Sequence, residues 1–343
     1  MSPKLRALLL AAATTGAAAF ANYDGPNLES FNFEYQSLRI AGSKPRGRDA
    51  PAVVFLPYGI IPYGDSLAFL SPAMEAVAQR GFAVALVEYP DIDVYPDQAG
   101  AEDFGKGDFA AAIQKICIEW GSRAMKTADA IKDGLCAQQG VDCSSIAVAG
   151  FSTGAGIATA LSTPFLIGQP TPLNIAAQLS VVWAPLLGAG QLGPGELPLL
   201  GLPTLYHPCF VNGAPLGPSP GPPPYSMRMD FILSPEKRLS VISELDEVFG
   251  NPPALEATSG PVFQLQQLYS DFCEDHGPKN DCIQGSGAGY YVVPAGEIAL
   301  VPGQSNHNSF SSNPTEGFFE PGGTEVWQAG AAFEWLLTTA FGP

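Results

Sequence analysis

The sequence predicts an α/β fold with a mostly parallel central sheet flanked by helices. Short, continuous apolar runs such as residues 52–56 (AVVFL) recur along the chain, and such runs are typical of strands that a parallel sheet buries on both faces. Segments with a helical apolar stripe alternate with these runs, as in proteins whose helices cover such a sheet. Of the 343 residues, 46% are hydrophobic and 14% are charged, so we expect a large buried core.

The N-terminal half provides the first group of expected elements. Ser71-Pro72 is typical of a helix start, with Ser as the N-cap and Pro at the first helical position, and Gly81 is typical of a helix end. After Asp108, apolar residues recur in steps of three and four, which predicts a long helix with one apolar face (Ile113, Ile116, Trp120, Ala124, Ala128, Ile131 and Leu135). An alternating edge hairpin over residues 31–40 and strands over 52–56 and 82–89 complete this half.

The C-terminal half continues the alternation of strands and helices. Residues 187–224 are crowded with Gly and Pro and show little periodicity. Because strands are predicted on both sides, we interpret this segment as an insertion within one domain, and long insertions are often lids or binding loops. The remaining expected elements are strands over residues 145–149, 178–183, 238–242 and 297–301 and a final amphipathic helix over 325–337.

The first 21 residues have the pattern of a secretory signal peptide. Lys4 and Arg6 precede an apolar stretch over residues 7–20, and Ala19-Phe20-Ala21 offers a cleavage site. A membrane anchor would need roughly 20 apolar residues, so a cleaved signal is favoured. We therefore expect a secreted protein in which a single domain spans residues 22–343.

Cysteine usage agrees with an oxidising compartment. The chain has six cysteines, an even number that permits three disulfides in any of 15 pairings. Local spacing favours Cys136–Cys143 and Cys273–Cys282, which leaves Cys117–Cys209 as a long-range bridge. No C-x-x-C pair is present, so a zinc or redox site has little support.

The charge balance excludes some partners. The formal net charge is −17, and an acidic chain repels nucleic acid and anionic membrane surfaces. No segment after the signal peptide is long and apolar enough to span a bilayer. The oligomeric state cannot be inferred from the composition.

The most informative motif is Gly150-Phe151-Ser152-Thr153-Gly154, which has the form G-x-S-x-G. It follows predicted strand 145–149 and opens an apolar helix over residues 155–161, which is the strand–turn–helix setting that the motif requires. The turn would place the Ser152 hydroxyl near a helix N-terminus, where negative charge is stabilised. We interpret Ser152 as a catalytic nucleophile.

With this motif, the chain resembles the α/β-hydrolase superfamily from about residue 50 onward. To a lesser extent, the stretch from Gly59 to Gly81-Phe82 resembles the branch that includes chlorophyllases, polyester hydrolases and dienelactone hydrolases. The superfamily resemblance implies an α/β-hydrolase fold and a catalytic triad whose members follow in the chain order Ser, acid, His.

The resemblance also implies where the base and the acid lie. His307 follows predicted strand 297–301, whereas the other two histidines lie in the Pro-rich insertion and between two cysteines. Asp246 follows predicted strand 238–242 and fits the acid best, with Glu244 as the alternative. In such a triad the base removes the serine proton, because a hydroxyl is a poor nucleophile at neutral pH, and the acid orients the imidazole.

An oxyanion hole needs two main-chain donors. The resemblance assigns one to the N–H of Thr153 and the other to the loop after strand 52–56, where Ile60 is the expected donor. Many relatives have His-Gly in this loop, and this chain has Tyr58-Gly59. Because the donor is a backbone group, the difference does not remove it.

These residues predict a secreted serine hydrolase that cleaves carboxylic esters through an acyl-enzyme. A small-molecule, lipid or polymer ester is the expected substrate, and neither a cofactor nor a metal ion is expected. Two alternatives stay open: a serine peptidase or amidase of the same fold, and a catalytically inactive hydrolase fold used for binding. The sequence gives neither the acyl length nor the alcohol of the substrate.

Overall fold

The computed structural model of the chain describes most of the expected strands and helices. The predicted signal peptide (residues 1–21), predicted strand 297–301 and, apart from Cys209, the insertion 187–224 lie outside the described residues. The described residues are 27–57, 65–89, 96–162, 172–181, 209, 233–243, 282–283, 288–293 and 329–342.

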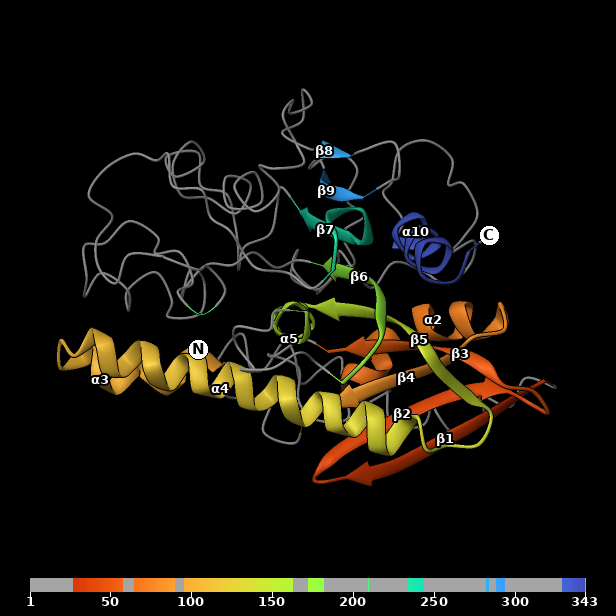
Figure 1. Ribbon diagram of the computed structural model, residues 1–343, viewed down its shortest axis with the longest axis horizontal. Coiled ribbons are helices and arrows are strands. Elements are labelled where there is room, and N and C mark those ends of the chain that lie inside the picture. Colours follow the sequence, from red (N-terminus) through yellow and green to blue (C-terminus); the bar gives the residue numbers. More distant parts are fainter. Residues whose placement is uncertain are drawn as a thin grey trace.

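The described strands form one nine-stranded sheet in the order β1-β2-β4-β3-β5-β6-β7-β9-β8 (Figure 1). Strands β4, β3, β5, β6, β7 and β9 run parallel to one another, and β1, β2 and β8 are antiparallel to their neighbours. The predicted mostly parallel sheet is confirmed. The strand bounds are β1 (Leu28–Tyr35), β2 (Leu38–Pro45), β3 (Ala50–Leu56), β4 (Ala83–Glu88), β5 (Val141–Phe151), β6 (Ile175–Val181), β7 (Arg238–Ser243), β8 (Cys282–Ile283) and β9 (Gly289–Val293).

The predicted strands that lie within the described residues are all present in this sheet, although several of their bounds differ. The early hairpin is confirmed as β1 and β2, and its two turn residues, Gln36 and Ser37, both have positive φ angles, as tight two-residue hairpin turns require. Strand β6 begins three residues before the predicted start at Gln178. Beside β7 lies β9, whose residues 290–293 have a strand-like apolar sequence.

Helices cover both faces of the sheet. Their bounds are α2 (Asp65–Gln79), α3 (Ala101–Gly105), α4 (Phe109–Asp129), α5 (Thr153–Leu161) and α10 (Ala329–Phe341), with 3-10 helices at Pro96–Gly100 and Pro235–Lys237 and a π-helix at Ala130–Leu135 that continues α4. The predicted long helix is confirmed, because α4 begins after Asp108, whose carboxylate accepts a hydrogen bond from the Ala111 N–H at 3.1 Å. Among the described helices, none combines the length and apolar content that a membrane crossing needs.

The predicted start of α2 was wrong. The helix begins at Asp65, so Pro72 lies inside it and not at its first position. Leu67 and Leu70, which precede Pro72, are 5% and 1% exposed, and they continue the buried stripe that Met74 and Val77 form farther along. Burial of these two leucines therefore outweighs the loss of a helical hydrogen bond at the proline.

The final helix also differs from its predicted bounds. Helix α10 extends to Phe341, four residues beyond the predicted end at Leu337. Its start at Ala329 follows residues that lie outside the described part of the chain. Phe341 packs against Phe82, with the ring centroids 5.2 Å apart, so the added turn has a contact that stabilises it.

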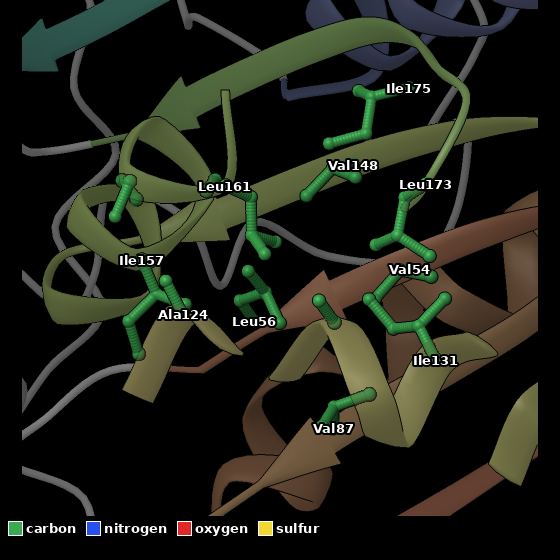
Figure 2. Packing of buried hydrophobic residues seen from close by; sticks show 14 of the residues in the cluster. Val54, Leu56, Val87, Ala124, Ile131, Val148, Ile157, Leu161, Leu173 and Ile175 are labelled. Carbon is green, nitrogen blue, oxygen red and sulfur yellow. The ribbon is translucent and has the colours of Figure 1, made fainter. Parts of the chain in front are cut away.

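Successive side chains along the central strands point to opposite faces of the sheet, and each face has its own hydrophobic core. On β3, Val53 and Phe55 pack with α2 and α10, whereas Val54 and Leu56 pack with α4 and α5 on the opposite face. Figure 2 shows the second of these cores, where Val54 and Leu56 lie close to Val148 of β5 and to side chains of α4 and α5. Burial on both faces explains why these strands read as continuous apolar runs.

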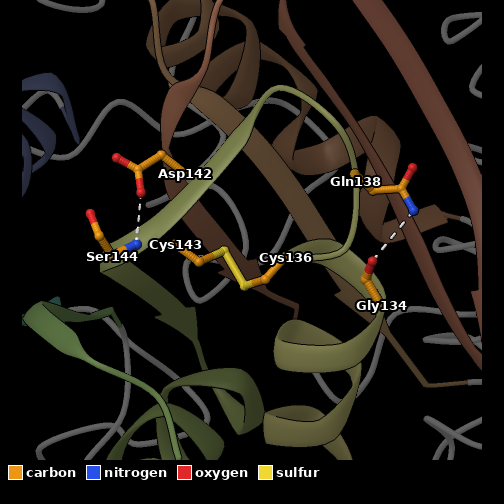
Figure 3. Close-up of a disulfide and its surroundings, with 6 residues drawn as sticks. All are labelled: Gly134, Cys136, Gln138, Asp142, Cys143 and Ser144. Carbon is orange, nitrogen blue, oxygen red and sulfur yellow. Dashed lines mark hydrogen bonds between the residues drawn. A yellow bond between two sulfur atoms is a disulfide. The ribbon is translucent and has the colours of Figure 1, made fainter.

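Strand β5 has an irregular start that a disulfide and an acidic side chain stabilise (Figure 3). Its pairing with β3 shifts between Asp142 and Ile146, and Cys143 in this shift is bonded to Cys136 at the end of the π-helix. The Asp142 carboxylate accepts a hydrogen bond from the Ser144 N–H at 2.8 Å, which lowers the pKa of that carboxyl below its usual value. The charged form therefore favours the folded state above the ordinary aspartate pKa, and the contribution is lost as the pH falls through the lowered value.

A second disulfide joins α4 to the insertion. Cys117 of α4 is bonded to Cys209, which is fully buried. Both this bridge and Cys136–Cys143 were predicted. The third predicted pair, Cys273–Cys282, includes a residue outside the described part of the chain and stays a prediction.

We expect the long-range disulfide to stabilise the fold more than the local one. The bonded cysteines are 92 residues apart in Cys117–Cys209 and 7 apart in Cys136–Cys143. In the chain-entropy model, a longer loop removes more freedom from the unfolded chain, which gives about 4 to 5 kcal/mol for the first bridge and about 2 to 3 kcal/mol for the second. Urea unfolding of the two double Cys→Ala variants beside the wild type measures both values, and a larger loss for the short bridge would contradict this prediction.

Candidate active site

Ser152 lies at the carboxyl end of β5, the fifth strand in the order of the nine-stranded sheet. Its backbone angles are φ 52° and ψ −118°, a combination that non-glycine residues rarely adopt and that costs about 1–3 kcal/mol. The next residue begins α5. The strand–turn–helix arrangement predicted for the G-x-S-x-G motif is therefore present. It lies at the carboxyl ends of the parallel strands, where open α/β folds bind ligands.

The two glycines of the motif allow the backbone to approach very closely. A Cβ atom at Gly154 would lie 2.2 Å from the Leu56 carbonyl oxygen, at the carboxyl end of β3. A Cβ atom at Gly150 would lie 2.4 Å from the Gly154 carbonyl oxygen. Both contacts are with backbone, which cannot move aside as a flexible side chain can. The glycines are therefore steric requirements of the turn.

Two hydrogen bonds tie this turn to the neighbouring strands. The Ser152 N–H donates to the Val181 carbonyl at the end of β6, at 2.9 Å, and the Gly154 N–H donates to the Pro57 carbonyl just after β3, at 3.0 Å. The turn thus depends on strands on both of its sides. It is also held directly against the first residue of the loop that contains the predicted second oxyanion donor.

Among the described residues, one backbone N–H in the first turn of α5 has no acceptor. The N–H groups of Ala155 and Gly156 both donate to the Ser152 carbonyl, and that of Gly154 donates to Pro57. Within the part of the chain that the structure describes, the Thr153 N–H has no acceptor. It is therefore available at the positive end of the helix dipole, as an oxyanion donor must be.

The surroundings of the Ser152 hydroxyl also differ from those of an ordinary N-cap serine. Ser152 is fully buried, and among the described residues its Oγ has no hydrogen-bond partner. A serine at a helix N-cap commonly bonds the N–H groups of the first turn, but Ser152 makes no such bond. A buried hydroxyl without a partner costs about 1–3 kcal/mol, and binding of a reactant could satisfy it.

Three packed aromatic rings support the end of β5, where the Ser152 turn begins. Phe151, which directly precedes the nucleophile, has its ring centroid 6.3 Å from those of both Phe55 and Phe333. The Phe55 and Phe333 centroids are 5.4 Å apart, and each of the three side chains is at most 1% exposed. One residue each from β3, β5 and α10 therefore fixes the strand end from which Ser152 departs.

The other predicted site residues lie outside the described part of the chain. Ile60 comes four residues after the end of β3, Asp246 three residues after β7, and His307 fourteen residues after β9. Strands β3, β7 and β9 run parallel to β5, so each of them ends on the side of the sheet where Ser152 lies. The roles of the three residues, and the choice between Asp246 and Glu244, stay predictions.

A buried polar cluster between α5 and β6 was not predicted from the sequence. Four polar side chains form it, each at most 3% exposed: Gln178 and Ser180 of β6, Thr159 of α5, and Ser162 directly after α5. Gln178 is hydrogen-bonded to the other three. The available signal was the pair of polar residues in the otherwise apolar run IAAQLSV. Within the described residues, no cluster of His, Cys, Asp and Glu could hold a metal ion.

Comparisons with known proteins gave structural likenesses alone. No family model and no curated protein matches the chain. Among solved structures, a phosphonate-inhibited esterase B from Lactobacillus rhamnosis is 15% identical with a TM-score of 0.42, over 85% of this chain and 82% of that one. A cold-adapted esterase from an Arctic intertidal metagenomic library is 13% identical with a TM-score of 0.40, over 79% and 86%. Esterase 2 of Thermogutta terrifontis is 17% identical with a TM-score of 0.40, over 78% and 83%.

At these identities and TM-scores, we draw no functional conclusion from the likeness. The fold follows from the chain's own topology: a mostly parallel sheet in the order given above, covered by helices on both faces, with a strained serine between β5 and α5. This is the architecture of the α/β-hydrolase fold.

We expect Gly154→Ala to disrupt the site and Gly105→Ala to leave it intact. The new methyl group at position 154 would collide with the backbone of β3, whereas a methyl group at Gly105 would meet no atom within 4 Å. Overpacking of this kind costs about 1–3 kcal/mol, and a shift of the turn by about 1 Å would slow reaction at Ser152 about 100-fold. Thermal unfolding and the rate of Ser152 labelling by a fluorophosphonate measure the two effects, and equal behaviour of both variants would contradict the prediction.

Proposed function

We propose that the protein is a secreted serine hydrolase that cleaves carboxylic esters through a Ser-His-Asp triad and an acyl-enzyme. The observation that carries this proposal is the conformation of Ser152, which is strained, buried and free of a hydrogen-bond partner among the described residues. Strain of this kind persists only where the surrounding structure imposes it, and it is concentrated at functional sites. A solely structural serine in this position would cap α5.

In the proposed reaction, His307, oriented by Asp246, accepts the Ser152 proton as Oγ bonds to the ester carbonyl carbon. The N–H groups of Thr153 and Ile60 stabilise the negative charge that develops on the carbonyl oxygen, and each such donor contributes about 3 kcal/mol. The carbon–oxygen bond to the alcohol then breaks, and His307 returns the proton to the leaving alcohol. Water, deprotonated by His307, attacks the acyl-enzyme, which releases the acid and restores Ser152.

Export from the cell is the part of the proposal that the disulfides support. Cys117–Cys209 and Cys136–Cys143 both form in the structure, and disulfides are rare in reducing compartments. Their presence agrees with the signal peptide predicted over residues 1–21.

The first test compares the wild type with Ser152→Ala on p-nitrophenyl esters of increasing acyl length. We expect the variant to lose about 10⁵–10⁶-fold in kcat, because it lacks the nucleophile. The matched control is Ser145→Ala, which removes a serine hydroxyl seven residues earlier on β5; that hydroxyl donates to the carbonyl of Ala340. The control should retain wild-type activity. The dependence of the wild-type hydrolysis rate on the acyl length of the ester measures the size of the acyl pocket.

Two results would contradict the ester proposal. A folded wild type that is inert on every ester but labelled at Ser152 by a fluorophosphonate would favour the peptidase or amidase alternative. A folded wild type that resists both reagents would favour the inactive hydrolase fold used for binding.

The triad acid has a separate test, because the neighbouring carboxylates Asp246 and Glu244 both follow β7. We expect Asp246→Asn to lower kcat about 10²–10⁴-fold, since the amide holds the wrong histidine tautomer. Glu244→Gln should have little effect on kcat. Steady-state kinetics of the two variants on one p-nitrophenyl ester decide the assignment, and the reverse pattern would move the acid to Glu244.

A further inference from the structure

Helix α5, which begins at the nucleophile, has few side chains large enough to fix its position. Its sequence is TGAGIATAL, and all nine residues are buried. Small side chains interlock weakly, so apolar packing restricts sliding of such a helix along the sheet less than large side chains would. A directional interaction would add to this packing and fix the position of α5 relative to β6.

Gln178 provides directional contacts of this kind. Its Nε2 donates to the Thr159 Oγ1 at 3.2 Å and to the Ser180 Oγ at 3.0 Å. Its Oε1 accepts a hydrogen bond from the Ser162 Oγ at 2.7 Å. Both amide protons and the carbonyl oxygen therefore have partners, in a site where each of these residues is at most 3% exposed. A buried amide that is fully satisfied fixes one arrangement of the elements it joins.

A chain of hydrogen bonds leads from this amide to the nucleophile turn. The Thr159 hydroxyl, which accepts from Gln178, donates to the Ala155 carbonyl at 2.8 Å. The Ala155 N–H in turn donates to the Ser152 carbonyl at 2.9 Å. Gln178 is also three residues before Val181, whose carbonyl accepts from the Ser152 N–H at 2.9 Å. The side chain thus connects α5 with the end of β6, two of the structures that hold Ser152.

We propose that Gln178 is a positioning residue for the nucleophile. Its amide sets the position of α5 relative to β6 and thereby the orientation of the Ser152 turn. This inference rests on the proposed function for its effect on catalysis. Because all hydrogen-bonding groups of the amide are occupied within the fold, Gln178 acts on the reaction only through α5 and β6.

The test compares Gln178→Met with Gln138→Met, which makes the same substitution at a half-buried glutamine whose amide contacts the Gly134 carbonyl after α4. Gln178→Met should speed amide hydrogen exchange in the peptide spanning residues 150–162, because the contacts to α5 are lost. It should also lower kcat for a p-nitrophenyl ester about tenfold or more, as small misplacement of a reacting group does. KM should stay close to the wild-type value, and Gln138→Met should show neither effect.

Thr159→Val extends the test with a milder change. Valine keeps the shape of threonine but removes the hydroxyl that links Gln178 to Ala155. We expect it to lower kcat in the same direction, and the double variant should lose no more than Gln178→Met alone, because both changes interrupt one chain of contacts. If Gln178→Met fails to fold, Thr159→Val alone carries the comparison.

A lower melting temperature with kcat unchanged in the folded enzyme would overturn the proposal, since a merely structural glutamine would behave in this way. Unchanged exchange over residues 150–162 would overturn it as well. If the wild type proves inert on esters, the proposed function fails on its own, and the exchange comparison still decides whether Gln178 holds the turn.

Discussion

The contact between Gly154 and the carboxyl end of β3 is the constraint on which the rest of the site depends. A Cβ atom at this position would lie 2.2 Å from the Leu56 carbonyl oxygen, so the backbones touch without an intervening side chain. This proximity lets the Gly154 N–H reach Pro57 and brings the start of the next loop to the first turn of α5. An oxyanion hole needs two backbone donors directed at one oxygen, and the proposed donors, Thr153 and Ile60, belong to the two segments that this contact joins.

The strained turn is supported from the two faces of the sheet by different kinds of interaction. On one face, the rings of Phe151, Phe55 and Phe333 stack beneath the strand end. On the other face, Gln178 binds the small, apolar helix α5 through hydrogen bonds. The two kinds of interaction follow from side-chain size. Large rings interlock by shape, whereas a helix with mostly small side chains needs directional bonds to select one position.

Much of the fold could be predicted because burial leaves a direct pattern in the sequence. Strands buried on both faces are continuous apolar runs, as in β3 and the second half of β5, and the stripe of α4 repeats at helical spacing. The start of α2 was missed because a local signal, Pro72, was taken as a boundary although tertiary burial of Leu67 and Leu70 carries the helix through it. The shift in β5 at Asp142 has no sequence period to indicate it.

How well the residues of the candidate site could be predicted likewise depends on whether their signal is local or comes from distant parts of the chain. Ser152 and Thr153 could be predicted as site residues because one short motif contains the strand end, the turn and the helix start, all of which the structure has. Ile60, Asp246 and His307 come from separate loops, so their assignment depends on which strands are parallel neighbours and on chain order. The role of Gln178 could not be inferred from the sequence, since a lone glutamine in a strand acquires meaning only when Thr159 and Ser162 of a neighbouring element lie against it. Such a residue acts through three-dimensional proximity alone, and the sheet that fixes Ser152 also creates that proximity.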